Sequence, residues 1–181
     1  MYQIGDLILY SSTGVCEVTD IKTLEVAGAE QDRLYYILRP LYQECIISTP
    51  VEQSKVFMRP IISRQEAERL IDRIPSIRAK AYHSRVLHQL AEHYEASFKS
   101  HDCAALIELT MSIYEKKQGL LQQKRKCSVL DDRFLKRAED LLFGELSAAL
   151  DIPVDHVSTY IAQRVQALNQ EGSGNAHECV Q

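Results

Sequence analysis

The feature that most constrains the fold of this chain is a change of pattern at Ser63. Before Ser63 the chain consists of short β-prone runs separated by turns, and after it apolar residues recur at helical spacing. A series of strands followed by a series of helices is typical of an α+β fold or of two separate domains. We therefore expect a domain over residues 1–62, an all-α domain over residues 63–170 and a flexible, polar tail over residues 171–181.

The first half contains five short β-prone runs bounded by turn signals. They are residues 7–10, 15–21, 34–38, 45–49 and 56–59. Each of the last three is followed within two residues by a proline, which cannot donate a hydrogen bond within a sheet. These five strands predict a small β-barrel, because closing a sheet on itself removes its exposed edges.

The second half contains five predicted helices. The first begins with a Ser-x-x-Glu capping box at Ser63 and ends before Pro75. The second spans residues 78–100, where apolar residues every four positions form one stripe. The stripe consists of Val86, Leu90, Tyr94 and Phe98. The remaining three helices begin at the capping or first-turn residues Asp102, Ser128 and Pro153.

Length and composition are those of an ordinary globular protein. The chain has 181 residues, of which 45% are hydrophobic and 25% are charged. No apolar run approaches the ~18 residues that a membrane helix needs, and no signal peptide is visible at the start. The five cysteines are odd in number and scattered, so no disulfide framework is implied. We expect a reduced, cytoplasmic protein that does not enter a membrane.

Catalytic and metal-binding chemistry have little support in the sequence. It has no Gly-x-Ser-x-Gly elbow, no Gly-rich phosphate loop and no His-Glu-x-x-His motif. Two His-x-Cys pairs, His101 with Cys103 and His177 with Cys179, lack the four closely spaced ligands of a typical zinc site. We expect a protein that is not an enzyme and that has no metal, cofactor or small-molecule substrate.

The most basic stretch lies between the third and fourth predicted helices. The chain has a net charge of −4, but residues 63–170 carry sixteen basic and fifteen acidic side chains. One cluster consists of Lys116, Lys117, Lys124, Arg125 and Lys126. A solvated helix end, where cations are favoured, explains the first two lysines. It explains residues 124–126 less well, and a contact with a phosphate backbone is the alternative.

A second candidate lies near the start of the second predicted helix, where Tyr82, His83 and Arg85 are close in sequence. One interpretation is an exposed helix start, which composition alone favours. The other is a flat ring that stacks against a nucleic-acid base, while nearby cations contact phosphates.

Several short motifs occur in an order that is specific when they are taken together. The chain opens with Ile4-Gly5-Asp6, the apolar run 7–10 and Thr13-Gly14-Val15. Further along come Gly28, Tyr35-Tyr36-Ile37-Leu38, Pro50, Arg59, Lys99-Ser100-x-Asp102, Ser128-x-x-Asp131 and Leu141-Leu142-x-x-Glu145-Leu146. Over residues 2–150 this order resembles the CarD/CdnL family of bacterial transcription regulators.

The resemblance implies that the first half is a Tudor/SH3-like RNA polymerase-interacting domain, also found in the transcription–repair coupling factor. Such a domain docks on the polymerase β subunit through a sheet edge. The resemblance further implies that the helical half contacts promoter DNA at the upstream edge of the opened bubble, where a family tryptophan wedges into the minor groove. The implied partners are the RNA polymerase β subunit and promoter DNA, and the implied activity is stabilisation of the open complex.

This chain departs from the family pattern in two respects. It has no tryptophan, and the wedge position falls near His83, with Tyr82 beside it. Two basic positions that some relatives use for the polymerase fall on Leu24 and Ser48. The resulting polymerase-binding candidates are Leu24, Val26, Cys45, Ile46, Ile47 and Ser48. The DNA-contacting candidates are Tyr82, His83, Arg85, Lys124, Arg125 and Lys126.

Two hypotheses follow from the sequence. The first is a transcription regulator that binds the polymerase β subunit, contacts promoter DNA and modulates the stability of the open complex. The second is a protein–protein adaptor on RNA polymerase that makes no DNA contact. The missing tryptophan and the acidic net charge motivate the second hypothesis.

Overall fold

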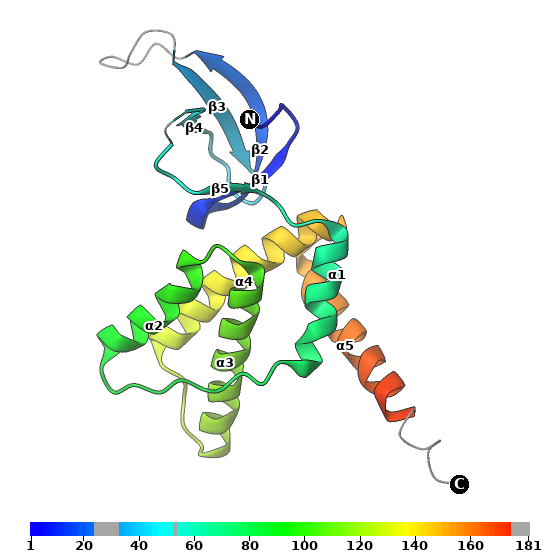
Figure 1. The fold of residues 1–181 in the computed structure, drawn as a ribbon. Helices are drawn as coiled ribbons and strands as arrows, with labels where there is room; N and C mark the ends of the chain where they lie inside the picture. Colours follow the sequence, from blue (N-terminus) through cyan, green and yellow to red (C-terminus); the bar gives the residue numbers. More distant parts are fainter. Residues whose placement is uncertain (24–32, 53, 175–181) are drawn as a thin grey trace. The chain divides into compact units, whose positions relative to one another are not determined.

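The computed structural model describes residues 1–23, 33–52 and 54–174 (Figure 1). The chain forms two compact units, Met1–Ile62 and Ser63–Gln181. The first unit is built from strands and the second from helices. The observed architecture is therefore α+β, with a boundary at the residue where the sequence pattern changes.

The first unit is a five-stranded antiparallel sheet (Figure 1). Its strands are β1 (Leu7–Tyr10), β2 (Gly14–Thr23), β3 (Leu34–Pro40), β4 (Ile47–Pro50) and β5 (Met58–Pro60). The order across the sheet is β4-β3-β2-β1-β5. A 3-10 turn, η1 (Ser11–Thr13), joins β1 to β2, and Gly14 follows it at φ 97, a backbone conformation that favours glycine.

The five predicted strands are confirmed, but the predicted barrel is not. Strands β4 and β5 are the two edges of the sheet, and among the described residues no ladder of hydrogen bonds joins them. Both edge strands are short, with four and three residues, and both end in a proline that has no N–H to donate. Such strands can form few hydrogen bonds with each other, so the sheet stays open.

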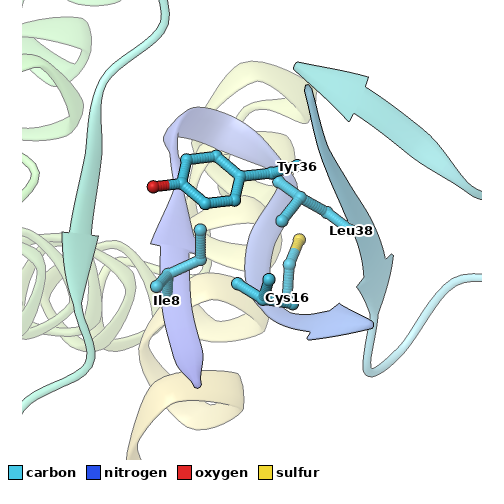
Figure 2. Packing of buried hydrophobic residues seen from close by; sticks show 5 residues of the cluster. Ile8, Cys16, Tyr36 and Leu38 are labelled. Atoms are coloured by element: carbon cyan, nitrogen blue, oxygen red, sulfur yellow. The ribbon is translucent and has the colours of Figure 1, made fainter. Parts of the chain in front are cut away.

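One hydrophobic cluster holds the sheet together (Figure 2). It consists of Ile8, Cys16, Val18, Tyr36 and Leu38, which are at most 2% exposed. The strand register brings them together, because Ile8 lies opposite Cys16, and Val18 lies opposite Leu38. The cysteine in this cluster is a buried apolar residue.

The second unit contains five helices and two 3-10 turns among its described residues. They are α1 (Arg64–Arg73), η2 (Ile74–Ser76), α2 (Leu87–Lys99), α3 (Cys103–Gln122), α4 (Val129–Leu150), η3 (Val154–His156) and α5 (Val157–Gly174). The prediction of five helices is confirmed. The last helix continues to Gly174, past residue 170, where the sequence predicted a tail. No helix in the described ranges has both the length and the apolar content that crossing a membrane requires.

The predicted caps at Ser63, Asp102 and Ser128 are confirmed, whereas Pro153 precedes the turn η3 and α5 begins only at Val157. The Ser63 hydroxyl accepts a hydrogen bond from the Glu66 N–H at 3.2 Å, and the Ser63 N–H donates to the Glu66 carboxylate at 2.8 Å. Asp102 accepts from the Ala104 N–H at 3.2 Å at the start of α3. Each cap satisfies backbone N–H groups that the first helical turn leaves without a partner.

The prediction of a helix over residues 78–100 is wrong in its first third, because residues 77–86 have no regular structure and α2 begins at Leu87. The Ser84 hydroxyl accepts from the Val86 N–H at 3.1 Å, and such a local turn competes with helix formation. The Lys80 carbonyl accepts from the Ser112 hydroxyl of α3 at 2.7 Å. The predicted stripe is therefore buried from Leu90 onward, while Val86 is 51% exposed.

The sheet core predicts a large difference between two isoleucines of the first unit. Ile8 is fully buried, whereas Ile4 is 63% exposed. We expect Ile8→Ala to lower the free energy of unfolding of this unit by about 2–5 kcal/mol, because it removes buried methyl groups and leaves a cavity. The matched control Ile4→Ala should change it by less than about 0.5 kcal/mol. Urea denaturation followed by circular dichroism measures both, and equal effects would contradict the described core.

Candidate functional site

Four of the six polymerase-binding candidates of the first unit lie at one edge of the sheet. Cys45 and Ile46 lie just before β4, and Ile47 and Ser48 are its first two residues. Ile46 is 75% exposed, and Cys45 and Ser48 are also exposed, while Ile47 packs against the sheet core. The remaining two candidates, Leu24 and Val26, lie outside the described residues.

Strand β4 offers a hydrogen-bonding edge. It pairs with β3 along one side, from Ile47 opposite Leu38 to Pro50 opposite Tyr35, and it is the outermost strand of the sheet. An edge strand presents backbone N–H and C=O groups to a further strand, and such strand addition is a common mode of peptide recognition. This arrangement is chemically suited to binding a strand of another protein.

Exposed apolar residues beside this edge were missed by the sequence analysis. Leu41 and Tyr42, in the β3–β4 connection, are 39% and 47% exposed, and Ile46 lies in the same connection. The signal was available, because three large apolar residues occur in a turn where polar residues are expected. We call β4 and residues 41–46 the edge surface.

The second unit contains a groove that collects residues predicted separately from the sequence. This first groove has a volume of about 790 Å³ and is lined by the 81–90 segment, α3 and the α3–α4 loop. His83 and Arg85 come from the first of these segments, and Arg125 and Lys126 from the loop. Two candidate clusters that lie about 40 residues apart in the chain thus share one surface.

The end of α3 determines which loop cations reach the groove. The Arg125 N–H donates to the Leu120 carbonyl at 2.8 Å, and the Lys124 N–H donates to the Leu121 carbonyl at 2.9 Å. This pattern is a Schellman motif, in which the residue with positive φ is usually glycine. Here that residue is Lys124, at φ 55. The exposed Lys124 does not line the groove, whereas Arg125 and Lys126 do.

Tyr82 is separated from the other ring candidate. Its ring stacks on His93 with centroids 3.7 Å apart and an interplanar angle of 17°. Tyr82 is half-buried and does not line the first groove, whereas His83 is exposed and does. His93 thus occupies one face of the Tyr82 ring, and His83 is the ring that the groove presents.

Lys116 differs from the solvated cation that the sequence suggested, whereas Lys117 lies on the surface. Lys116 is only 7% exposed, and its Nζ lies 2.7 Å from Oδ1 of Asp131, which is 1% exposed. Lys117 pairs with Asp132 at 2.7 Å on the surface. The interpretation of Lys116 as a solvated cation is therefore wrong, and the cations of this cluster without an ion-pair partner in the described residues are Lys124, Arg125 and Lys126.

Asp131 is the centre of a buried polar cluster. Its Oδ1 also accepts from the Tyr94 hydroxyl of α2 at 2.7 Å, and its Oδ2 accepts from the Ser128 hydroxyl at 2.7 Å. Burial raises the pKa of Asp131, but hydrogen bonds from Lys116, Tyr94, Ser128 and Cys127 outweigh it and lower the pKa to about 2. Asp131 is therefore ionised at neutral pH, and it ties α2, α3 and the start of α4 together.

The His-x-Cys pairs that the sequence analysis weighed as metal ligands do not form a site in the described part of the chain. No group of three or more His, Cys, Asp or Glu residues there is placed to hold an ion. The buried Cys103 thiol donates to Glu145 Oε2 at 3.1 Å, so Cys103 belongs to the helical core. His177 and Cys179 lie outside the described residues.

Comparison with known proteins bears on the sheet unit. The family model of the CarD-like/TRCF RID domain matches residues 2–62, which is the sheet unit. No match was found among curated proteins.

The buried ion pair predicts a large difference between two neighbouring lysines. We expect Lys116→Met to lower the free energy of unfolding of the helical unit by about 3–5 kcal/mol, because it leaves Asp131 buried without its cation. The matched control Lys117→Met removes an exposed ion pair and should cost less than about 1 kcal/mol. Chemical denaturation measures both values, and a small effect of Lys116→Met would contradict the described cluster.

A pH series on the same two variants separates charge from packing. Because the pKa of Asp131 is depressed to about 2, its stabilising contribution is present above its ordinary pKa of ~3.9. It is lost as the pH falls from ~4 towards 2. Lys116→Met raises this pKa, so its stability should fall less steeply over that interval than that of Lys117→Met. Parallel curves for the two variants would contradict the assignment.

Proposed function

Since residues 2–62 are a CarD-like RNA polymerase-interacting domain, we propose that this chain is a cytoplasmic transcription regulator that binds the polymerase β subunit and contacts promoter DNA. The match of residues 2–62 is the observation that carries the proposal. The domain family is non-catalytic, and the regulator acts by binding. Its helical unit modulates the stability of the open promoter complex.

The edge surface supports the polymerase contact. A strand of the β subunit adds to the exposed edge of β4 through backbone hydrogen bonds, and Ile46 supplies apolar contact beside it. Leu24 and Val26 belong to the matched domain and contribute to the same contact. This mode requires no basic side chain at position 48, where the chain has Ser48.

The first groove supports the DNA contact. Arg85, Arg125 and Lys126 have no ion-pair partner among the described residues, so their charges are available to phosphates. Such contacts position a protein on DNA without reading its sequence. His83 presents an exposed ring at the same groove, and Tyr82 supports the segment that carries it. Lys124 adds an exposed cation at the end of α3.

Tethering explains how a modest DNA contact affects initiation. A protein bound to the polymerase holds its second binding unit near the promoter at an effective concentration that reaches the millimolar range for short linkers. If the helical unit binds the opened promoter more tightly than the closed one, it shifts the equilibrium towards the open state. The free energy of promoter opening changes by the difference between the binding free energies for the open and the closed promoter.

The adaptor hypothesis is the second candidate, and it rests on apolar residues close to the groove. Leu87, Leu121 and Val129 are 66%, 69% and 85% exposed, which suits a contact with another protein. In this alternative the sheet unit binds the polymerase, and the helical unit recruits a second protein.

The polymerase contact predicts different effects for two exposed isoleucines of the sheet unit. We expect Ile46→Asp to weaken binding of the full chain to the purified β subunit at least tenfold, or about 1.4 kcal/mol, because it places a charge in the contact. The control Ile4→Asp makes the same change at a residue that is 63% exposed and lies away from β4 in the chain, and it should retain binding. Surface plasmon resonance measures both, and equal affinities would contradict the edge assignment.

The DNA contact predicts salt-dependent binding to a promoter duplex. The logarithm of the binding constant should fall linearly with the logarithm of salt concentration, with a slope of about −0.9 for each phosphate contact. Arg125→Gln with Lys126→Gln should reduce the steepness by about 1.8. The control pair Lys99→Gln with Lys136→Gln removes two exposed cations that line neither groove of the helical unit. Fluorescence anisotropy gives the slopes, and a flat wild-type response would favour the adaptor.

A further inference from the structure

A second cationic groove lies next to the irregular segment 77–86. It has a volume of about 550 Å³ and combines residues of α1, α2 and α3 with the first half of the segment. Its cations are Arg73, Arg78 and Lys80, and Glu108 is the one described carboxylate that lines it. The same segment continues through His83 and Arg85 into the first groove. One stretch of chain therefore supplies cations to both grooves.

The burial pattern of the first half of this segment, residues 77–81, is that of an extended chain. Arg78 and Lys80 are exposed, whereas Ile77, Ala79 and Ala81 are partly buried. The backbone is extended at both ends, with φ −73 and ψ 124 at Ile77 and φ −94 and ψ 109 at Val86. Alternate residues of an extended chain point to the same side, about 6.6 Å apart. Arg78 and Lys80 are thus presented together on the outer side.

Contacts with the helices hold this segment in place. The Lys80 carbonyl accepts from the Ser112 hydroxyl of α3 at 2.7 Å, and the Tyr82 ring stacks on His93 of α2. Figure 1 shows the segment passing over α3 between α1 and α2. The backbone that carries these cations is therefore already fixed, so less conformational entropy is lost when the cations bind a ligand.

The charges of the two grooves are complementary to a polyanion. The second groove has three cations and one carboxylate, and the first has four cations and two carboxylates, so each has a net charge of +2. The whole chain has a net charge of −4. Arg78 and Lys80 have no ion-pair partner among the described residues, whereas Arg137 and Arg164 on other surfaces are paired with Glu95 and Asp72.

We infer that residues 77–86 form a continuous track for the phosphodiester backbone of DNA, leading from the second groove into the first. Arg85 lies seven residues after Arg78, so the chain between them reaches at most about 25 Å. A DNA strand advances 3.4 Å per nucleotide, so the track covers at most about seven nucleotides of one strand. This inference rests on the proposed DNA contact, and it adds Arg73, Arg78 and Lys80 to the cations that make it.

The test uses one labelled DNA duplex longer than a helical turn. It measures the slope of the logarithm of the binding constant against the logarithm of the salt concentration. Arg78→Gln with Lys80→Gln should reduce the steepness by about 1.8, since each lost phosphate contact removes about 0.9. Combining these changes with Arg125→Gln and Lys126→Gln should reduce it by about 3.6, because one DNA molecule contacts both grooves. The control pair Lys99→Gln with Lys136→Gln should keep the wild-type slope.

A charge-preserving variant separates electrostatics from folding. Arg78→Lys with Lys80→Arg keeps both charges and should retain the wild-type slope, whereas structural damage would reduce binding here too and would overturn the inference. The track is overturned if Arg78→Gln with Lys80→Gln leaves the slope unchanged while Arg125→Gln with Lys126→Gln reduces it. That result leaves the proposed DNA contact intact. Salt-dependent binding of polyglutamate without binding of DNA overturns both and identifies an acidic polypeptide as the ligand.

Discussion

The surface of the helical unit depends on the ion pair and the hydrogen bonds made by one buried carboxylate, that of Asp131. A charge removed from water must be paired, and Asp131 is satisfied by Lys116 from α3, Tyr94 from α2 and Ser128 before α4. These bonds fix the end of the α3–α4 loop, where Ser128 lines the first groove together with Lys116 and Asp131. The cations of that loop are exposed, and they are not needed to neutralise Asp131 because the buried Lys116 already does so.

The two units offer different chemistry to the partners proposed for them. The sheet unit presents an edge strand, whose backbone groups bind another strand whatever its side chains are. The helical unit presents unpaired cations along an anchored, non-helical segment, which suits a phosphate backbone whatever its sequence is. Neither surface reads a base sequence. Under the proposed function, promoter specificity would therefore come from the polymerase and not from this chain.

Local signals predicted the elements of this fold better than its long-range contacts. The capping boxes at Ser63 and Ser128 gave the helix starts correctly, because their hydrogen bonds are made within four residues. The helix expected over residues 78–100 failed at its start, since the Ser112 bond to Lys80 comes from a distant helix. Burial of Lys116 was also beyond sequence reasoning, because its partner lies fifteen residues away on α4. The predicted barrel was wrong because the edge strands β4 and β5, with four and three residues, are too short to pair with each other.

Site-specific photocrosslinking in a complex of the full chain, RNA polymerase and an open promoter tests the central claim most directly. A photoreactive amino acid is placed in turn at Ile46, Lys80 and Arg125, which represent the edge surface and the two grooves. We predict crosslinks to the β subunit from Ile46 and to promoter DNA from both Lys80 and Arg125. Crosslinks from Lys80 and Arg125 to protein alone, or none from Ile46 to the β subunit, would contradict this account.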